Sequence, residues 1–254
     1  MNPNTRPQAG EAILRLGQGE VAFGYTLAGR PFWTDRPLLC LGPPKARVLL
    51  PPDLVEEIPA FEEGAVDPDR LEELALGPPI LLLLAARAIW ALHASAVFVH
   101  GRLFVFLGES GRGKSTLAAL SYPGWTRAAD DLLPFELVRG RLLAHLDYPQ
   151  LKLDTPRLFD GASAPVAAFV ELAGPGSAEE PQLTRLRPSE TARLLLGQTV
   201  SARRYGPDLL TAHLEACVSA ANAVPAYRLA LPRDLARLDE AGDCISELTR
   251  PSGP

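Results

Sequence analysis

Residues 108–115, Gly-Glu-Ser-Gly-Arg-Gly-Lys-Ser, fit the pattern of the phosphate-binding P-loop. In such a loop, glycines allow consecutive backbone N–H groups to converge on phosphate oxygens. Lys114 supplies a mobile positive charge, and the hydroxyl of Ser115 can bind Mg²⁺. The pattern therefore predicts a protein that binds a nucleoside triphosphate. The predicted binding residues are Gly108, Glu109, Ser110, Gly111, Arg112, Gly113, Lys114, Ser115 and Thr116.

The segments around this loop have the patterns expected of a strand and a helix. An apolar run, residues 103–107, precedes the loop, and residues 115–120 can begin a helix whose N-terminal dipole favours phosphate. Two strand patterns, residues 94–99 and 102–107, are separated only by His100 and Gly101, which predicts a hairpin that leads into the loop. Further strands are predicted over 132–138, 141–145 and 166–172, and helices over 188–196 and 209–223.

Two adjacent carboxylates, Asp130 and Asp131, follow a predicted short strand over residues 125–129. Phosphoryl transfer to a hydroxyl needs a carboxylate near the acceptor proton and a second oxygen ligand for Mg²⁺ beside Ser115. At the end of a strand both side chains can reach one site. The alternatives are a solvated turn or a helix cap for the aspartates, and a structural role for His93, which lies beside apolar residues.

Three segments together resemble the catalytic domain of the HPr serine kinase/phosphorylase family, and especially its shorter relatives encoded among peptide-tailoring (lasso peptide) enzymes. They are residues 92–96 (LHASA), 108–116 (GESGRGKST) and 129–132 (ADDL), with weaker similarity over 148–153 and 224–229. The resemblance implies an α/β fold with a P-loop-type kinase core, and ATP and Mg²⁺ as cofactors. It also implies transfer to a Ser hydroxyl of a peptide or small protein, and a homo-oligomer.

The resemblance also implies roles for individual residues. Asp130 would be the general base, Asp131 and Ser115 would hold Mg²⁺, and His93 would lie behind the phosphates and contact the aspartates, so that the catalytic set is Asp130, Asp131, His93 and Lys114. The Gly- and Ile-rich signature that follows the aspartates in the bifunctional enzymes is missing, so phosphorylase activity is not expected. For Arg203–Arg204 and Lys152, phosphate or substrate contacts and ordinary surface charge both remain open.

Composition limits the class of protein. The chain has 254 residues, 47% of them hydrophobic, and a net charge of −5, which argues against nucleic-acid partners. Three scattered cysteines indicate buried thiols, without a zinc site. The strongest membrane candidate, residues 80–90, is far shorter than a membrane span, and no signal sequence begins the chain. We therefore expect a cytoplasmic protein without a membrane partner.

Proline and glycine divide the chain into two regions. Short strand patterns over 21–27, 37–41 and 47–50 predict a small β-rich N-terminal region, residues 1–66, with a role in substrate recognition, followed by a catalytic domain, residues 67–254. Two alternatives to a peptide kinase remain. One is a nucleotide-sensing protein that transfers no phosphoryl group, and the other is a kinase acting on a small-molecule hydroxyl.

Overall fold

The computed structural model describes residues 11–16, 19–24, 46–49, 81, 84–85, 88–146, 163–234 and 237–249. The chain forms two compact units, residues 1–90 with 200–211 and residues 91–199 with 212–254. The predicted domain boundary near residue 67, Lys152 and the segment 148–153 lie outside the described residues. The loop, His93 and both aspartates belong to the second unit.

The first unit contains a three-stranded sheet with the order β2-β1-β3. Strand β1 (Glu11–Leu16) pairs with β2 (Gly19–Gly24) in antiparallel orientation and with β3 (Ala46–Leu49) in parallel orientation. From the apolar run 80–90, Leu81, Leu84 and Trp90 are buried. No helix in the described part of the chain is long and apolar enough to cross a membrane.

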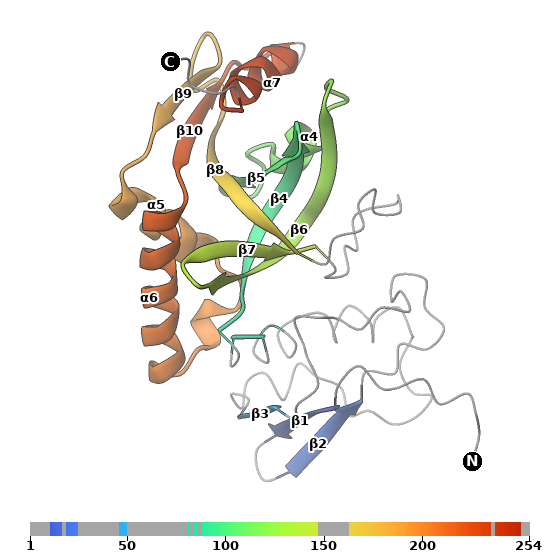
Figure 1. Ribbon diagram of the computed structural model, residues 1–254, viewed down its shortest axis with the longest axis vertical. Coiled ribbons are helices and arrows are strands. Elements are labelled where there is room, and N and C mark those ends of the chain that lie inside the picture. The colour runs from blue at the N-terminus through green and yellow to red at the C-terminus, as the bar shows by residue number, and fades with distance from the viewer. Residues whose placement is uncertain are drawn as a thin grey trace, which may run out of the picture. The chain divides into compact units, whose positions relative to one another are not determined.

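The second unit is a mixed α/β structure built on one large sheet, which confirms the predicted α/β class (Figure 1). The strand order is β5-β4-β6-β7-β8-β10-β9, and an additional pairing between β5 and β8 closes the first five strands into a ring. Strand β8 runs parallel to β5 and β10, while β4–β5, β6–β7, β7–β8 and β9–β10 are antiparallel. The strands are β4 (Trp90–Val99), β5 (Arg102–Leu107), β6 (Trp125–Val138), β7 (Arg141–His145), β8 (Ser163–Pro175), β9 (Gln182–Arg185) and β10 (Ala226–Leu231).

The hairpin predicted before the loop is present. Strands β4 and β5 pair from Val99↔Arg102 to Ser95↔Phe106. Their two-residue connection has φ 47° at His100 and φ 78° at Gly101, as in the tight turns that match the twist of paired strands. The backbone N–H of His100 also donates to the carbonyl of Gly124 at 2.9 Å, which fixes the turn against the start of β6.

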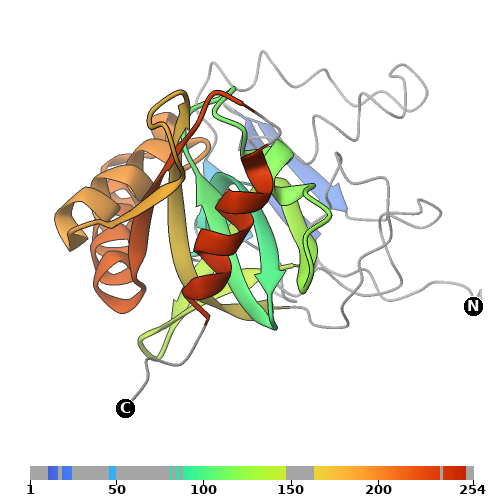
Figure 2. The ribbon, with the colours of Figure 1, turned by 90° about the horizontal axis from the view of Figure 1, so that it is seen from above.

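The helices are α4 (Lys114–Ala118), α5 (Pro188–Gln198), the 3₁₀ helix η2 (Ala202–Arg204), α6 (Pro207–Ala223) and α7 (Leu238–Glu247). Of these, η2 belongs to the first unit. Helix α7 lies across the strands in Figure 2 and buries Ala241 and Ile245 in a core with Phe104 and Phe106 of β5 and Leu229 of β10. Gly242 makes this packing possible, because a Cβ there would lie 2.5 Å from the ring of Tyr122.

One prediction about the strands was wrong. The aspartates do not end a strand, because residues 125–138 form a single strand of 14 residues, β6, that continues through both of them. Asp131 has φ 85°, in the left-handed region. A residue in that conformation interrupts the alternation of side chains along a strand. This backbone irregularity, rather than a strand end, allows two consecutive side chains to line the same cavity.

Candidate functional site

The Gly-rich loop follows directly after strand β5. Residues 103–107 are buried, and β5 pairs with β4 on one side and β8 on the other. Gly108 follows with φ 140°, and a Cβ there would lie 3.1 Å from the carbonyl oxygen of Leu172. Gly113, with φ 94°, is the N-cap of α4. The loop thus needs glycine where it leaves β5 and where it enters the helix.

Helix α4 is shorter than the sequence predicts, with only five residues. A helix dipole is the sum of aligned peptide dipoles, and a helix of this length therefore contributes little to phosphate binding. The backbone N–H groups of the loop itself are the donors that remain for an anion. Helix α4 instead serves to bury Lys114 and Leu117 at the base of the loop.

The ammonium group of Lys114 lies inside the loop. It is 6% exposed, and its Nζ donates to the carbonyl oxygens of Gly108 at 2.7 Å and Glu109 at 3.2 Å. The side chain of Arg112 stabilises the loop with two hydrogen bonds. Its Nη1 donates to the carbonyl of Ala173 at 2.8 Å, and its Nη2 donates to Glu109 Oε2 at 2.7 Å. The loop is therefore held in its curved form by its own side chains, with a cation at its centre.

Asp130 is the most heavily bonded carboxylate of the site. It is 3% exposed. Its Oδ1 accepts hydrogen bonds from Ser95 Oγ at 2.5 Å and Ser115 Oγ at 2.7 Å, and its Oδ2 accepts one from Arg127 Nη2 at 2.5 Å. Hydrogen bonds of this charge-assisted kind are short and strong. Asp130 is thus fixed beside the P-loop hydroxyl, with donors on both of its oxygens.

Asp131 has a different environment from its neighbour. Its side chain is 34% exposed, and Oδ1 lies 3.4 Å from Nδ1 of His93, which is 37% exposed. His93 comes from β4, two residues before Ser95 and therefore on the same side of that strand. The predicted contact between His93 and the aspartate pair is present, and it is made with Asp131.

A cavity of about 220 Å³ brings most of the predicted residues together. We call it the phosphate cavity. It is lined by His93, Ser95, Ser110, Gly111, Gly113, Lys114, Ser115, Thr116, Asp130 and Asp131. Three predicted loop residues, Gly108, Glu109 and Arg112, line a second cavity instead. Arg203 and Arg204 belong to η2 of the first unit, and their role stays a prediction.

The donors of the phosphate cavity fit Mg²⁺. A hydroxyl, Ser115, and a carboxylate, Asp130, lie 2.7 Å apart beside the loop, and Mg²⁺ prefers such oxygen ligands together with nucleotide phosphates. In the described part of the chain, no cluster of three His, Cys, Asp or Glu side chains could hold a metal by itself.

Sequence reasoning missed Ser95 and Arg127, which hold Asp130. The position of Ser95, two residues after His93 in a strand, was a usable signal, because alternate residues of a strand share a face. Arg127 gave no such signal. A regular strand would place Arg127 and Asp130, three residues apart, on opposite faces, so their ion pair could not be expected from the alternation of side chains.

A buried Cys–His contact in the same unit is not a second active site. Cys217 Sγ lies 3.3 Å from His213 Nε2, which is 2.8 Å from Thr199 Oγ1. Burial raises the pKa of Cys217 to about 12 and lowers the pKa of His213, the opposite of what an activated thiolate needs. His213 and His145 are both buried.

Comparisons with known proteins show a distant structural likeness. No protein-family model matches the chain, and no curated protein matches it. Among solved structures, it is similar to the Hpr(Ser) kinase/phosphatase from Coxiella burnetii, with 17% identity over 63% of this chain and 88% of that chain, at a TM-score of 0.37. A likeness this distant assigns the chain to no family, so its function has to be inferred from the chemistry of the site.

Proposed function

We propose that this protein is an ATP- and Mg²⁺-dependent phosphotransferase that transfers the γ-phosphoryl group to a Ser hydroxyl of a peptide or small protein. The observation that carries the proposal is the phosphate cavity, in which Lys114, Ser115, two carboxylates and His93 meet at a Gly-rich loop. Such a set contains a cation for the phosphates, oxygen ligands for a metal and a base for a hydroxyl.

Lys114 and the loop N–H groups neutralise the triphosphate. On binding, the ammonium exchanges its contacts with the carbonyls of Gly108 and Glu109 for phosphate oxygens. Ser115 and Asp130 hold Mg²⁺, which when bound offsets the negative charge on the phosphates. Because the cation and the N–H groups are already in place, little reorganisation is needed as charge develops on the transferred group.

We assign the two aspartates in the opposite way to the resemblance. Asp130 is buried and accepts from two hydroxyls and a guanidinium, so a substrate hydroxyl has little access to its oxygens. Asp131 is one-third exposed and lines the same cavity. We therefore assign Asp130, together with Ser115, to the binding of Mg²⁺. We assign Asp131 to the acceptor, as the group that takes the proton of its hydroxyl. A positioned base of this kind contributes about 10²–10⁴ in rate.

His93 orients Asp131. Its Nδ1 lies 3.4 Å from Oδ1 of Asp131, close enough to hold the carboxylate in one orientation. The imidazole is a positioning group in this scheme, because it acts through the carboxylate and not on the phosphates. A His93→Gln variant should retain part of the activity, since an amide nitrogen can still donate to Asp131.

The test is intact-mass analysis of Ser-containing peptides after incubation with the protein, ATP and Mg²⁺. Peptides encoded beside the gene are the first acceptors to examine, because the resemblance includes enzymes that modify such peptides. A gain of about 80 Da, the mass of a phosphoryl group, is expected with the wild type and not with Lys114→Ala. Tight ATP binding without a gain on any peptide, but with a gain on a small-molecule alcohol, would redirect the proposal to that acceptor. Binding without transfer to any acceptor would make the protein a nucleotide sensor.

A further inference from the structure

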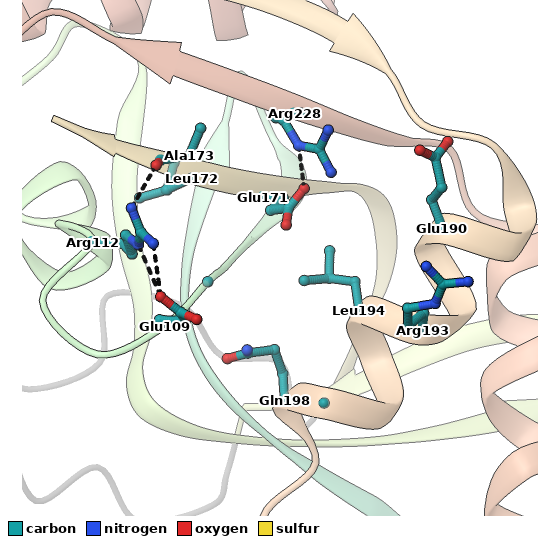
Figure 3. A pocket seen from close by; sticks show the side chains of 12 residues that line it. Glu109, Arg112, Glu171, Leu172, Ala173, Glu190, Arg193, Leu194, Gln198 and Arg228 are labelled. Carbon is teal, nitrogen blue, oxygen red and sulfur yellow. Dashed lines mark hydrogen bonds and ion pairs between the residues drawn. The ribbon is translucent and has the colours of Figure 1, made fainter. Parts of the chain in front are cut away.

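A second, larger cavity lies next to the P-loop. We call it the side cavity; its volume is about 500 Å³, within the range of about 300–1,000 Å³ that is usual for ligand sites. Figure 3 shows its walls, which come from the start of the loop, the end of β8, helix α5 and β10. The proposed nucleotide site does not use most of the residues that line the side cavity. The full lining is Gly108, Glu109, Arg112, Glu171, Leu172, Ala173, Glu190, Arg193, Leu194, Gly197, Gln198 and Arg228.

The side cavity borders the loop where the end of the triphosphate is expected. The Nζ atom of Lys114 lies 2.7 Å from the carbonyl oxygen of Gly108 and 3.2 Å from that of Glu109, and both residues line the side cavity. A P-loop lysine reaches the β- and γ-phosphates. The side cavity therefore begins near the transferred phosphoryl group, which is the acceptor side of a kinase rather than the nucleoside side.

The charges of the side cavity are unequally compensated. Arg112 pairs with Glu109 at 2.7 Å, and the Nε of Arg228 donates to Glu171 at 2.7 Å, as Figure 3 shows. Glu190 pairs with Arg187, which is not a lining residue, at 3.0 Å. Arg193 forms no ion pair with any residue that the structure describes. The lining itself is balanced, with three arginines and three glutamates, but because Glu190 is paired with Arg187 outside the lining, Arg193 is left without an ion pair among the described residues.

The remaining walls suit a short stretch of peptide. Leu172 and Leu194 provide apolar surface, and the carboxamide of Gln198 offers both a donor and acceptors. Gly197 leaves room, because a Cβ built there would meet no atom within 4 Å. Mixed apolar and amide surface, with a guanidinium that forms no ion pair among the described residues, is complementary to a peptide segment that carries a carboxylate.

We propose that the side cavity binds the part of the acceptor next to its serine, and that Arg193 selects an acidic side chain there. This inference rests on the proposed phosphotransferase function and adds the class of acceptor, an acidic Ser-containing peptide. The acceptor serine lies at Asp131 in the phosphate cavity, and its acidic neighbour lies beyond Glu109. Arg228, which uses only its Nε–H for Glu171 within the described residues, supplies further N–H donors to the same carboxylate.

The experiment compares three labelled peptides that differ only next to a central serine, with Asp, Asn or Lys. Their binding to the full chain is measured by fluorescence anisotropy in the presence of Mg²⁺ and a non-hydrolysable ATP analogue, so that the result does not depend on phosphoryl transfer. We expect the Asp peptide to bind at least tenfold more tightly than the Lys peptide, with Asn between them. Equal binding of all three peptides, or no binding, would overturn the proposal.

Two pairs of variants locate the binding. Arg193→Glu should remove or reverse the preference for Asp, while Arg141→Glu, the same change at an exposed residue of β7 outside the cavity, should not. Gly197→Trp should block peptide binding, while Gly197→Ala adds only a methyl group and should not. Both Gly197 variants should fold, because the position is helical and open.

The affinity for the ATP analogue separates the possible failures. It should be unchanged in Arg193→Glu and Gly197→Trp. If Gly197→Trp weakens the nucleotide and spares the peptide, the side cavity holds the nucleoside and the inference is wrong. If the Asp peptide binds most tightly and the Lys peptide most weakly, but no peptide gains phosphate when ATP is present, acidic-peptide binding is supported and the phosphotransferase function fails instead.

Discussion

The two neighbouring aspartates should respond in opposite ways to the same substitution. Asp130→Asn replaces a carboxylate that is 3% exposed and accepts from Ser95, Ser115 and Arg127. In one orientation the new amide nitrogen faces the guanidinium of Arg127, so that a donor opposes a donor. In the other it faces two hydroxyl groups, which must rotate to accept from it. In both, the positive charge of Arg127 loses its charged partner.

The cost of this change can be estimated from the contacts. Removing one partner of a buried ion pair costs about 3–5 kcal/mol, and the low end, about 3 kcal/mol, applies because Arg127 is 29% exposed. Asp131→Asn should cost less than about 1 kcal/mol, since its ion pair is partly exposed. Asparagine also tolerates the left-handed backbone of residue 131.

Urea denaturation followed by tryptophan fluorescence and circular dichroism measures both values, because Trp125 lies in the same strand, β6, as the aspartates. Steady-state kinetics then gives the complementary result. Asp131→Asn should lower kcat by about 10²–10⁴ and leave the affinity for Mg²⁺-ATP intact. Equal losses of stability in the two variants would refute the contacts described here. A stable, inactive Asp130→Asn beside an active Asp131→Asn would restore the division that the resemblance implies.

Three further results are expected. Cys217, whose pKa is raised to about 12 by burial, should not react with a thiol reagent at pH 8 until urea unfolds the chain. Burial lowers the pKa of His213 below 6.5, so the unfolded state takes up its proton first as the pH falls. Stability should therefore fall with pH from about 6.5 down to the folded pKa, by up to about 1.4 kcal/mol per pH unit, and His213→Gln, measured by the same denaturation assay, should remove this dependence. In Gly174→Ala, the new Cβ would lie 2.6 Å from Nη1 of Arg112, at φ 94°. This variant should be about 1–3 kcal/mol less stable and should have a higher KM for ATP, and an unchanged KM would show that Arg112 does not support the loop.

The local features of the site could be predicted from the sequence, because each is encoded within a few residues. The strand over 102–107, the turn at His100–Gly101 and the Gly-rich loop follow from an apolar run and from glycine positions, and all are found where expected. The contact of His93 with the aspartate pair also exists. Each of these predictions depends only on residues that are close together in the sequence.

The features that could not be predicted from the sequence depend on residues that are far apart in the chain. Nothing local shows that β6 continues through Asp131 in a left-handed conformation, because the strand is completed by its pairing with β4 and β7. The side cavity joins residues of the loop, of β8, of α5 and of β10, and such a combination exists only in the folded chain. Strands β9 and β10 and helix α7 were also not predicted, since they are short segments, of 4, 6 and 10 residues.

The double pairing of β5 has a consequence for how the protein is made. One of its neighbours, β4, is adjacent in sequence, but the other, β8, is paired through contacts such as Phe104↔Ala168, more than 60 residues away. Long-range pairings of this kind form slowly, because the intervening chain must close first. During synthesis, a ribosome that has just released the P-loop still has to translate β8 before β5 is enclosed. Nucleotide-binding competence should therefore appear late on the nascent chain, well after the loop itself has emerged.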